Sequence, residues 1–431
     1  MAIAYSGIVV AFGTTVVASR DVFNPLCFVL FIGIVRYSCP AFLLLVGVEP
    51  PEDIAQFYRL MRLSDSDWPW AHVLALTSLA GIVLGWFLLQ SGTFQTSRLN
   101  FSFPAGISHA ALFGMLVGGA ALVVFIVKNV SLGAIVTGAI RNATIQEGTG
   151  VYFRFIYMAI AGSILLSAYL LERNRRRIAL IPVLACTVVL LTLGGRGRAI
   201  TPLAAGLLLQ WYRNRERHGW AVLHVKIKYI IAGLFVGLLA TWLFHFVALY
   251  RGGHGLSAFG QSVSLQGIWE YLQYSMFVEF GHLHSLAGAV VIGPGVLGGQ
   301  TFLGTLTFPL SKLLPIPGRS AGVYIVETLV GFHSEDRWGL HASLIGDAYL
   351  NFGVIGIMLI MPLFGMLMKL LYAKFRKGTL NAALYAFATV YGLNLFLKSI
   401  EAWPHMLVGL VFIVVITRLS VLFNFRQRVF G

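Results

Sequence analysis

The sequence predicts an all-α polytopic membrane protein, and three observations support this fold class. Hydrophobic residues make up 58% of the chain and charged residues only 11%, whereas soluble domains carry about 25% charged residues. Apolar segments recur along the whole length, at lengths that suit a bilayer. Basic residues gather in short runs between these segments, as they do in cytoplasmic loops. We therefore expect one integral membrane domain over residues 1–431.

About eleven apolar segments, eleven to twelve in all, are the expected transmembrane helices. Their ranges are 3–19, 24–48, 69–90, 108–128, 153–171, 178–193, 199–212, 229–249, 346–372, 381–399 and 405–423. The first segment has neither a basic stretch before it nor a small-residue cleavage site after it. Residues 1–19 are therefore expected to be a span and not a removed signal peptide.

Four basic clusters set the expected orientation of these helices. They are RNRRR at 173–177, the run at 212–228, AKFRKG at 373–378 and NFRQRVFG at 424–431. With all four in the cytoplasm, the N-terminus and the longest loop face the outer side. The net charge of +15 reflects these clusters, so we expect membrane lipid and not nucleic acid as a partner.

Residues 250–345 are the largest segment expected outside the membrane, as a periplasmic loop. Two runs in it, IWEYLQYSMFVEF at 268–280 and SAGVYIVETLVGF at 320–332, have helical spacing of apolar residues. They predict short amphipathic helices that lie on the membrane surface or re-enter the membrane.

The motif GGRGR at 194–198 lies between two unusually short apolar runs. Runs of 16 and 14 residues, 178–193 and 199–212, extend about 21–24 Å, less than the roughly 30 Å hydrocarbon core. Arg196 and Arg198 are therefore expected below the outer membrane surface, where a guanidinium fork can hold phosphate or pyrophosphate. The alternative is that both side chains only reach out to lipid headgroups.

A second group of polar residues precedes and enters the predicted span 346–372. His341 is a candidate general base, and Asp347 could orient or deprotonate a hydroxyl. Arg319 and Arg337 could bind phosphate or a sugar carboxylate. The alternative is a solvent-exposed loop whose charged residues only keep it hydrated. Close helix packing is expected at Asn351, Gly353 and Gly356.

Two further positions bear on ligand binding. Arg251 lies where the predicted span 229–249 meets the long loop and is a further candidate for phosphate. His282 and His284 are two residues apart, so on a helix they point to different sides. A histidine metal pair on a helix has i, i+4 spacing, so we expect no metal there.

The motif DSD at Asp65–Asp67 has two interpretations. It could hold a divalent cation against a pyrophosphate, or Asp67 could cap the helix that begins at WPWAHVLAL. The cysteines lie in apolar runs without CxxC spacing, which predicts neither a disulfide framework nor a metal site. We expect no metal and no other cofactor. The cysteines are Cys27, Cys39 and Cys186.

The motifs GGRGR and LHASLIGDAYLNFGVIGI, with one dominant outer loop between them, resemble the Wzy-type oligosaccharide repeat-unit polymerases of bacteria. They are also similar to the related O-antigen ligases. The resemblance covers roughly Leu190 to Gly356; the earlier part matches only in hydropathy. It implies a metal-independent GT-C-type glycosyltransferase of the inner membrane, with its active site facing the periplasm. Its implied substrates are undecaprenyl-pyrophosphate-linked oligosaccharides, which it would join into O-antigen or a related surface polysaccharide. A polysaccharide chain-length regulator is an expected protein partner.

The resemblance also bears on single residues. Ligases have an arginine in a motif like Arg196–Arg198 and a loop histidine before a closing helix, which His341 matches by position. The His-Asn pair that is usual in ligases is His341-Ala342 here, which favours a polymerase. Two alternatives stay open: a ligase that transfers glycan to lipid A-core, and a transporter or flippase of an anionic lipid-linked sugar. The absence of a sequence repeat weighs against the transporter.

Overall fold

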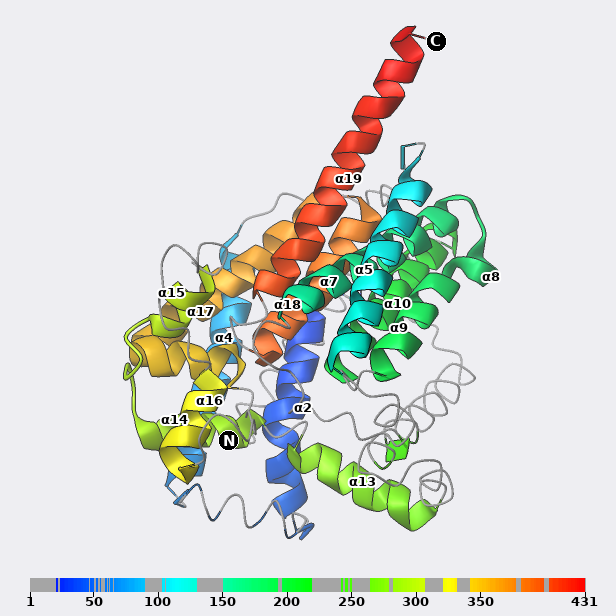
Figure 1. Cartoon of the computed structure of the whole chain (residues 1–431). Coiled ribbons are helices and arrows are strands. Elements are labelled where there is room, and N and C mark those ends of the chain that lie inside the picture. Colours follow the sequence, from blue (N-terminus) through cyan, green and yellow to red (C-terminus); the bar gives the residue numbers. More distant parts are fainter. Residues whose placement is uncertain are drawn as a thin grey trace. The chain divides into compact units, whose positions relative to one another are not determined.

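The structure is a computed structural model of the whole chain. It describes the residues 24–45, 66–89, 106–129, 150–192, 196–218, 264–278, 282–306, 321–331, 342–376, 381–398 and 403–430, with scattered positions between these ranges. Every regular element of this described part is an α-helix (Figure 1), which confirms the predicted all-α class.

Most of the described helices follow the predicted segments. The helices at predicted spans are α2 (Pro25–Leu45), α4 (Asp67–Leu88), α5 (Ile107–Asn129), α7 (Gly150–Glu172), α8 (Arg176–Ala179), α9 (Ile181–Thr192), α10 (Arg196–His218), α17 (Ser343–Arg376), α18 (Ala382–Lys398) and α19 (Trp403–Phe430). The helices in the predicted loop are α13 (Leu265–Val278), α14 (His282–Ile292), α15 (Gln300–Leu306) and α16 (Ala321–Val330). Of these, α13 and α16 confirm the two predicted loop helices.

By length and composition, four of the described helices can cross a membrane. They are Asp67–Leu88, Ile107–Lys128, Phe155–Glu172 and Ser343–Phe375. This number is smaller than the eleven spans expected, because it covers only the described residues, and some apolar helices among them, such as Ala382–Lys398, have fewer than 18 residues. The predicted spans 3–19 and 229–249 lie almost entirely outside the described residues. The described helices therefore indicate a membrane protein, but they do not account for eleven transmembrane spans.

Contacts divide the chain into two compact units. Unit 1 comprises residues 1–94, 272–373 and 391–404, and unit 2 comprises 95–271, 374–390 and 405–431. In unit 1, α14 packs against α2, α4 and α16 (Figure 1). Eight of its eleven residues are buried, from His282 to Ala289. The predicted outer loop thus contributes a helix to the core of unit 1.

Unit 2 is built on two helix pairs, α5 with α7 and α9 with α10. Gly118 lets α5 approach α7 closely, because a Cβ atom there would lie 2.4 Å from Cβ of Ala159. Gly206 likewise lets α10 approach α9 closely, because a Cβ atom there would lie 2.6 Å from a methyl carbon of Val183. The two short apolar runs around GGRGR therefore pack against each other, and α10 extends well beyond its apolar part.

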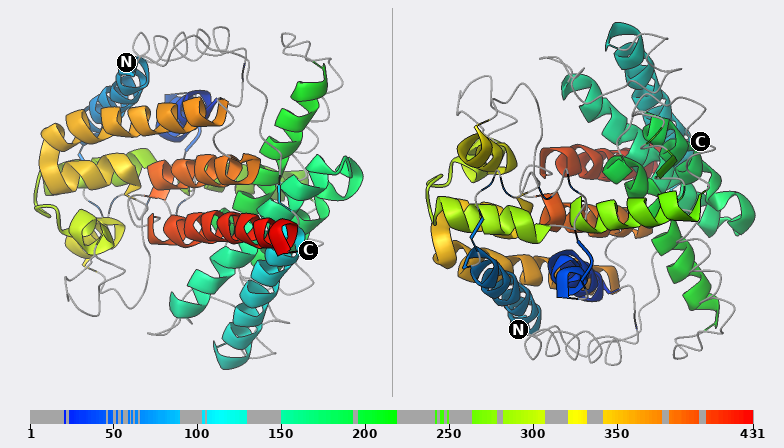
Figure 2. Two further views of the ribbon diagram at one scale, coloured as in Figure 1. Left: turned by 90° about the horizontal axis from the view of Figure 1, so that it is seen from above. Right: turned by 90° about the horizontal axis from the view of Figure 1, so that it is seen from below.

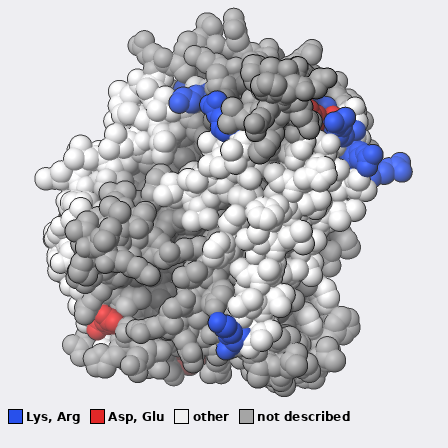
Figure 3. All heavy atoms as spheres, turned by 45° about the horizontal axis from the view of Figure 1, so that its top comes forward, with Lys and Arg blue, Asp and Glu red and all other residues white. Residues whose placement is uncertain are grey.

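Three of the basic clusters lie at one end of unit 2. Arg213, in α10, donates to the side-chain oxygen of Asn174 at 3.5 Å, which joins the clusters 212–228 and 173–177. The ring of Tyr212 lies 5.0 Å from that of Phe375 in the third cluster. Figure 3 shows one group of Lys and Arg side chains at the right-hand edge, and others at the upper left and near the bottom. The described parts of these three clusters therefore lie together, while the cytoplasmic orientation stays a prediction.

The helix α17 is sharply bent at Gly353, where the backbone has φ 65° and ψ −154°. The two halves fold back towards each other (Figure 2, left). A Cβ atom at Gly356 would lie 2.6 Å from the carbonyl oxygen of Ala348, across the bend. Gly353 and Gly356 were expected to pack against another helix. That expectation was incomplete, because they permit a turn within their own helix.

Replacing Gly353 with alanine is expected to destabilise the protein by about 1–3 kcal/mol, because only glycine readily adopts this backbone conformation. Gly346→Ala, in the same helix, is the matched control. Its new methyl would meet only side-chain atoms at 3.7 and 3.9 Å, so it should be neutral or slightly stabilising. The measurement is the apparent melting temperature in detergent. Equal melting temperatures for the two variants would contradict the prediction.

Candidate functional site

The candidate site lies in unit 1, where an arginine of α2 meets a histidine of α14. Arg36 is half-buried in an otherwise apolar helix. Its Nη1 atom lies 2.8 Å from Nε2 of His282. Because arginine only donates hydrogen bonds, Nε2 of His282 must accept this one. The imidazole is therefore neutral, with its proton on Nδ1.

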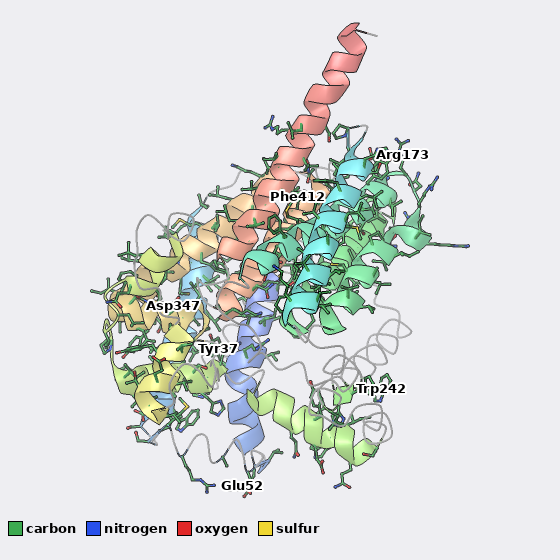
Figure 4. All side chains as sticks on the ribbon, viewed as in Figure 1. Tyr37, Glu52, Arg173, Trp242, Asp347 and Phe412 are labelled. Carbon is green, nitrogen blue, oxygen red and sulfur yellow. The ribbon has the colours of Figure 1, made fainter. Side chains whose placement is uncertain are left out.

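A second contact joins α2 to the beginning of α17. The hydroxyl of Tyr37 donates to Oγ of Ser343 at 2.9 Å, and both residues are buried. Figure 4 shows Tyr37 on α2 and Asp347 on α17. Tyr37 lies eight residues before the end of α2, about 12 Å at 1.5 Å per residue. The beginning of α17 therefore lies beside the body of α2 and not at its tip.

Ser343 itself has an unusual backbone conformation, with φ 57°. Non-glycine residues seldom adopt it, and it often marks a functional or tightly constrained position. Here it is held by the bond from Tyr37 and by a weaker one, at 3.5 Å, from the Gly346 amide to Ser343 Oγ. The chain thus makes an abrupt entry into α17 directly after His341 and Ala342.

The two histidines of α14 have different surroundings, as their spacing predicts. The ring of His282 lies near Tyr37, with 6.4 Å between centroids. His284 meets Trp68 of α4 edge to face, at 4.8 Å. Both are almost completely buried. His284 therefore contributes to packing, whereas His282 contacts Arg36.

Asp347 lies in a buried polar network of its own. Its Oδ1 atom accepts hydrogen bonds from the Thr301 hydroxyl at 2.5 Å and from Nδ2 of Asn351 at 2.9 Å. Asn351 Nδ2 also donates to Thr301 Oγ1 at 2.6 Å. All three residues are at most 2% exposed. The network joins the beginning of α15 to the first half of α17.

Backbone hydrogen bonds strengthen this connection. The amides of Gly295 and Leu297 donate to the carbonyls of Tyr349 and Leu350, at 3.0 and 2.9 Å. These carbonyls lie in the last turn before the bend, where a helix lacks partners of its own. The segment between α14 and α15, which donates these bonds, contains four glycines with positive φ: Gly293, Gly295, Gly298 and Gly299.

The structure describes little of the other predicted site. Arg196 and Arg198 lie in the first turn of α10, but their side chains are outside the described part, as are Arg251, Arg319, Arg337 and His341. Their assignments stay predictions. The described part brings Asp347 together with Thr301 and Asn351, neither of which the sequence singled out as its partner.

The DSD motif is described only in part. Asp65 lies outside the described residues. Asp67 begins α4, and its Oδ2 atom accepts bonds from the amide and hydroxyl of Ser64, at 2.7 and 2.6 Å. Among the described residues no group of three or more His, Cys, Asp or Glu side chains could hold a metal ion. The contacts of Asp67 support its role at the helix N-terminus, although Ser66 occupies the cap position.

Arg36 is the residue that the sequence analysis missed. It lies inside a predicted span, in the run FIGIVRYSC. A charged residue inside a membrane helix is costly and commonly functional, so this signal was present in the sequence. Lys369, inside the predicted span 346–372, was missed in the same way, and so was Asp21, which lies between two predicted spans. The Asp21 carboxylate accepts a bond from Tyr372 at 2.8 Å, and the Lys369 ammonium lies 4.9 Å from the Trp86 ring.

The apolar helices indicate an α-helical membrane protein, and the contact of Arg36 with His282 lies inside one helical unit. Comparisons with protein-family models, with curated proteins and with solved structures found no match.

Proposed function

We propose that this protein is a Wzy-type polymerase, which joins undecaprenyl-pyrophosphate-linked oligosaccharide repeat units into O-antigen or a related surface polysaccharide. It would be a GT-C-type glycosyltransferase of the bacterial inner membrane with its site facing the periplasm. The resemblance of GGRGR and LHASLIGDAYLNFGVIGI to this family is one support. A chain-length regulator would be its protein partner.

The structural observation that best supports the proposal is the position of Ser343. This residue contacts α2 in the interior of unit 1, and His341 is two residues away along the chain. A substrate with a lipid anchor presents its reacting group close to the membrane. A base close in sequence to a residue that contacts an apolar helix suits such a substrate better than one in a solvated loop.

In the proposed reaction, a hydroxyl at the non-reducing end of one repeat unit attacks the anomeric carbon of the growing glycan. The bond from that carbon to the lipid pyrophosphate breaks, and the pyrophosphate leaves with the electron pair. His341 takes the proton of the hydroxyl, with Asp347 as the alternative base, and Arg337 helps to bind the sugar or phosphate. Arginines stabilise the leaving charge without a metal or another cofactor. The pyrophosphate-binding residues would be Arg196, Arg198, Arg251 and Arg319.

The test uses purified protein in detergent with a lipid-pyrophosphate-linked repeat unit, EDTA and no nucleotide sugar. We expect a ladder of products with one-unit steps. Arg196→Ala and Arg198→Ala should each abolish the ladder while the protein stays in the membrane, because pyrophosphate stabilisation would be lost. Arg177→Ala, an exposed arginine of α8, is the control that removes an equal charge and should leave the ladder unchanged.

Each contrary result identifies an alternative. Transfer of glycan only to an added lipid A-core acceptor would indicate a ligase. Movement of the substrate across vesicle membranes without new bonds would indicate a transporter. A ladder that forms only with a divalent cation would contradict the metal-independent mechanism and turn attention to the DSD motif.

A further inference from the structure

The turn between α7 and α8 presents arginines directly after an apolar helix. The segment Phe155–Glu172 of α7 is long and apolar enough to cross a membrane, and Arg173 is the next residue. Arg173 and Arg175 are both exposed, and Figure 4 shows Arg173 at the periphery of unit 2. When a helix crosses a membrane, the residues that follow its apolar stretch lie at the level of the lipid headgroups.

The backbone of this turn is fixed by hydrogen bonds. The amide of Arg175 donates to the carbonyl of Leu170 at 2.9 Å, and the amide of Asn174 donates to that of Leu171 at 3.1 Å. Asn174 has φ 60°, the left-handed conformation in which many helices end, and these two bonds are the pair that such a helix end forms. The turn therefore holds Arg173 and Arg175 on either side of one constrained residue.

Arg173 and Arg175 carry charges that no acidic side chain of the described residues neutralises by an ion pair. The adjacent carboxylate, that of Glu172, accepts a hydrogen bond from the amide of Phe103 at 3.2 Å. The guanidinium of Arg173 lies 5.5 Å from the centroid of the Tyr169 ring, and this cation–π contact leaves its N–H groups able to donate. Both arginines can therefore bind an anion.

An apolar surface continues from these arginines along α9. Ile181, Leu184 and Val188 are 56%, 45% and 60% exposed, and their spacing places them on one face of the helix. Ile178, between the arginines and α9, is exposed as well. A phospholipid can contact both surfaces, with its acyl chains along α9 and its phosphate near the arginines. A free phosphate or an acidic peptide would use the arginines alone and leave the apolar face uncovered.

We propose that Arg173 and Arg175 bind the headgroup phosphate of an anionic phospholipid such as phosphatidylglycerol. The planar fork of arginine holds a phosphate through two hydrogen bonds. A lipid with a net negative charge gains from both arginines, whereas the ammonium group of a zwitterionic lipid opposes that attraction. The inference goes beyond the proposed function, because this lipid is a partner of unit 2 and takes no part in glycosyl transfer.

The test measures binding of phosphatidylglycerol and phosphatidylcholine, with identical acyl chains, to the purified full chain in detergent by native mass spectrometry. We expect phosphatidylglycerol to bind more tightly. A basic residue beside anionic lipid strengthens binding about fivefold, so Arg173→Gln and Arg175→Gln should each weaken phosphatidylglycerol binding by that factor. The double variant should weaken it about twentyfold. Binding of phosphatidylcholine should not change.

The matched control is Arg59→Gln. Arg59 is also exposed, but it forms an ion pair with Glu52, so this variant removes an equal charge and should bind phosphatidylglycerol like the unmodified protein. The melting temperature of each variant without added lipid shows whether it is folded. Should the double variant fail to fold, the two single variants decide the question.

Several results would overturn the proposal. If the arginines only offset the negative end of α7, the double variant melts at a lower temperature but keeps the same preference for phosphatidylglycerol. Displacement of the lipid by an equal concentration of glycerol 3-phosphate would show that the anion alone is recognised. A glutamate-rich peptide that binds more tightly than the lipid, with the same dependence on Arg173 and Arg175, would assign the surface to an acidic protein segment. None of these measurements depends on product formation.

Discussion

Replacing Gly85 or Gly365 with alanine is expected to destabilise unit 1 by about 3 kcal/mol or more, because either methyl group would collide with backbone. A Cβ atom at Gly85 would lie 1.9 Å from the carbonyl oxygen of Pro362, and one at Gly365 would lie 2.1 Å from that of Ile82. Backbone cannot move aside as a side chain can, so α4 and the second half of α17 would have to separate. Overpacking of this kind costs about 1–3 kcal/mol and occasionally more. Glycines commonly permit such close approach of membrane helices.

The matched control is Gly119→Ala in α5. No atom lies within 4 Å of the Cβ position there, and alanine is the better helix former by up to about 1 kcal/mol. The measurement is the apparent melting temperature of the purified variants in detergent, together with resistance to unfolding by SDS. Variants of Gly85 and Gly365 as stable as Gly119→Ala would show that α4 and α17 do not pack in this way.

Removing the Asp347 carboxylate is expected to destabilise the protein by about 3 kcal/mol. Asp347→Ala would leave the Thr301 hydroxyl and the Asn351 amide without their shared acceptor, and a buried polar group left unpaired costs about 1–3 kcal/mol. Thr301→Val should have a smaller effect, because it removes the Thr301 hydroxyl as donor and acceptor but leaves the bond from Asn351 to Asp347. Both values would be measured by unfolding in SDS.

The control for this prediction is Ser163→Ala in α7. Ser163 is equally buried, but its hydroxyl donates to a carbonyl of its own helix at 2.8 Å, so its loss should cost less than about 1 kcal/mol. Asp347→Asn separates structure from catalysis: if Asp347 is the base, this variant loses turnover while most of its stability remains. Unchanged stability in both Asp347→Ala and Thr301→Val would refute the structural role.

The sequence predicted the helices well, because long apolar runs bounded by charged or glycine-rich segments leave few alternatives. It also located α13 and α16 from their spacing alone. It did not predict the bend in α17. Gly353 lies in a continuous apolar run, and nothing local distinguishes a glycine that packs against another helix from one that reverses the chain. The close approach at Gly81 and Gly85 was visible as a GxxxG pattern and was overlooked.

The site was harder to predict than the fold, because its partners are far apart in the sequence. Arg36 and His282 are separated by 246 residues, and Tyr37 and Ser343 by 306. Composition and motifs indicate which residues could act as a base or bind phosphate, but only tertiary packing brings them together. Asp347 illustrates this: the sequence predicted that it acts on the hydroxyl of a substrate, and its described contact is with the hydroxyl of Thr301.

The bend at Gly353 has a consequence for how the protein enters the membrane during synthesis. The 22 residues of 354–375 are long enough to be recognised as a transmembrane segment, whereas the ten residues of 343–352 are not. The shorter half would therefore reach its place only after α2 and α4 have been inserted, by docking against them together with α14. Chains still under assembly would consequently lack the buried hydrogen bond from Tyr37 of α2 to Ser343 of α17.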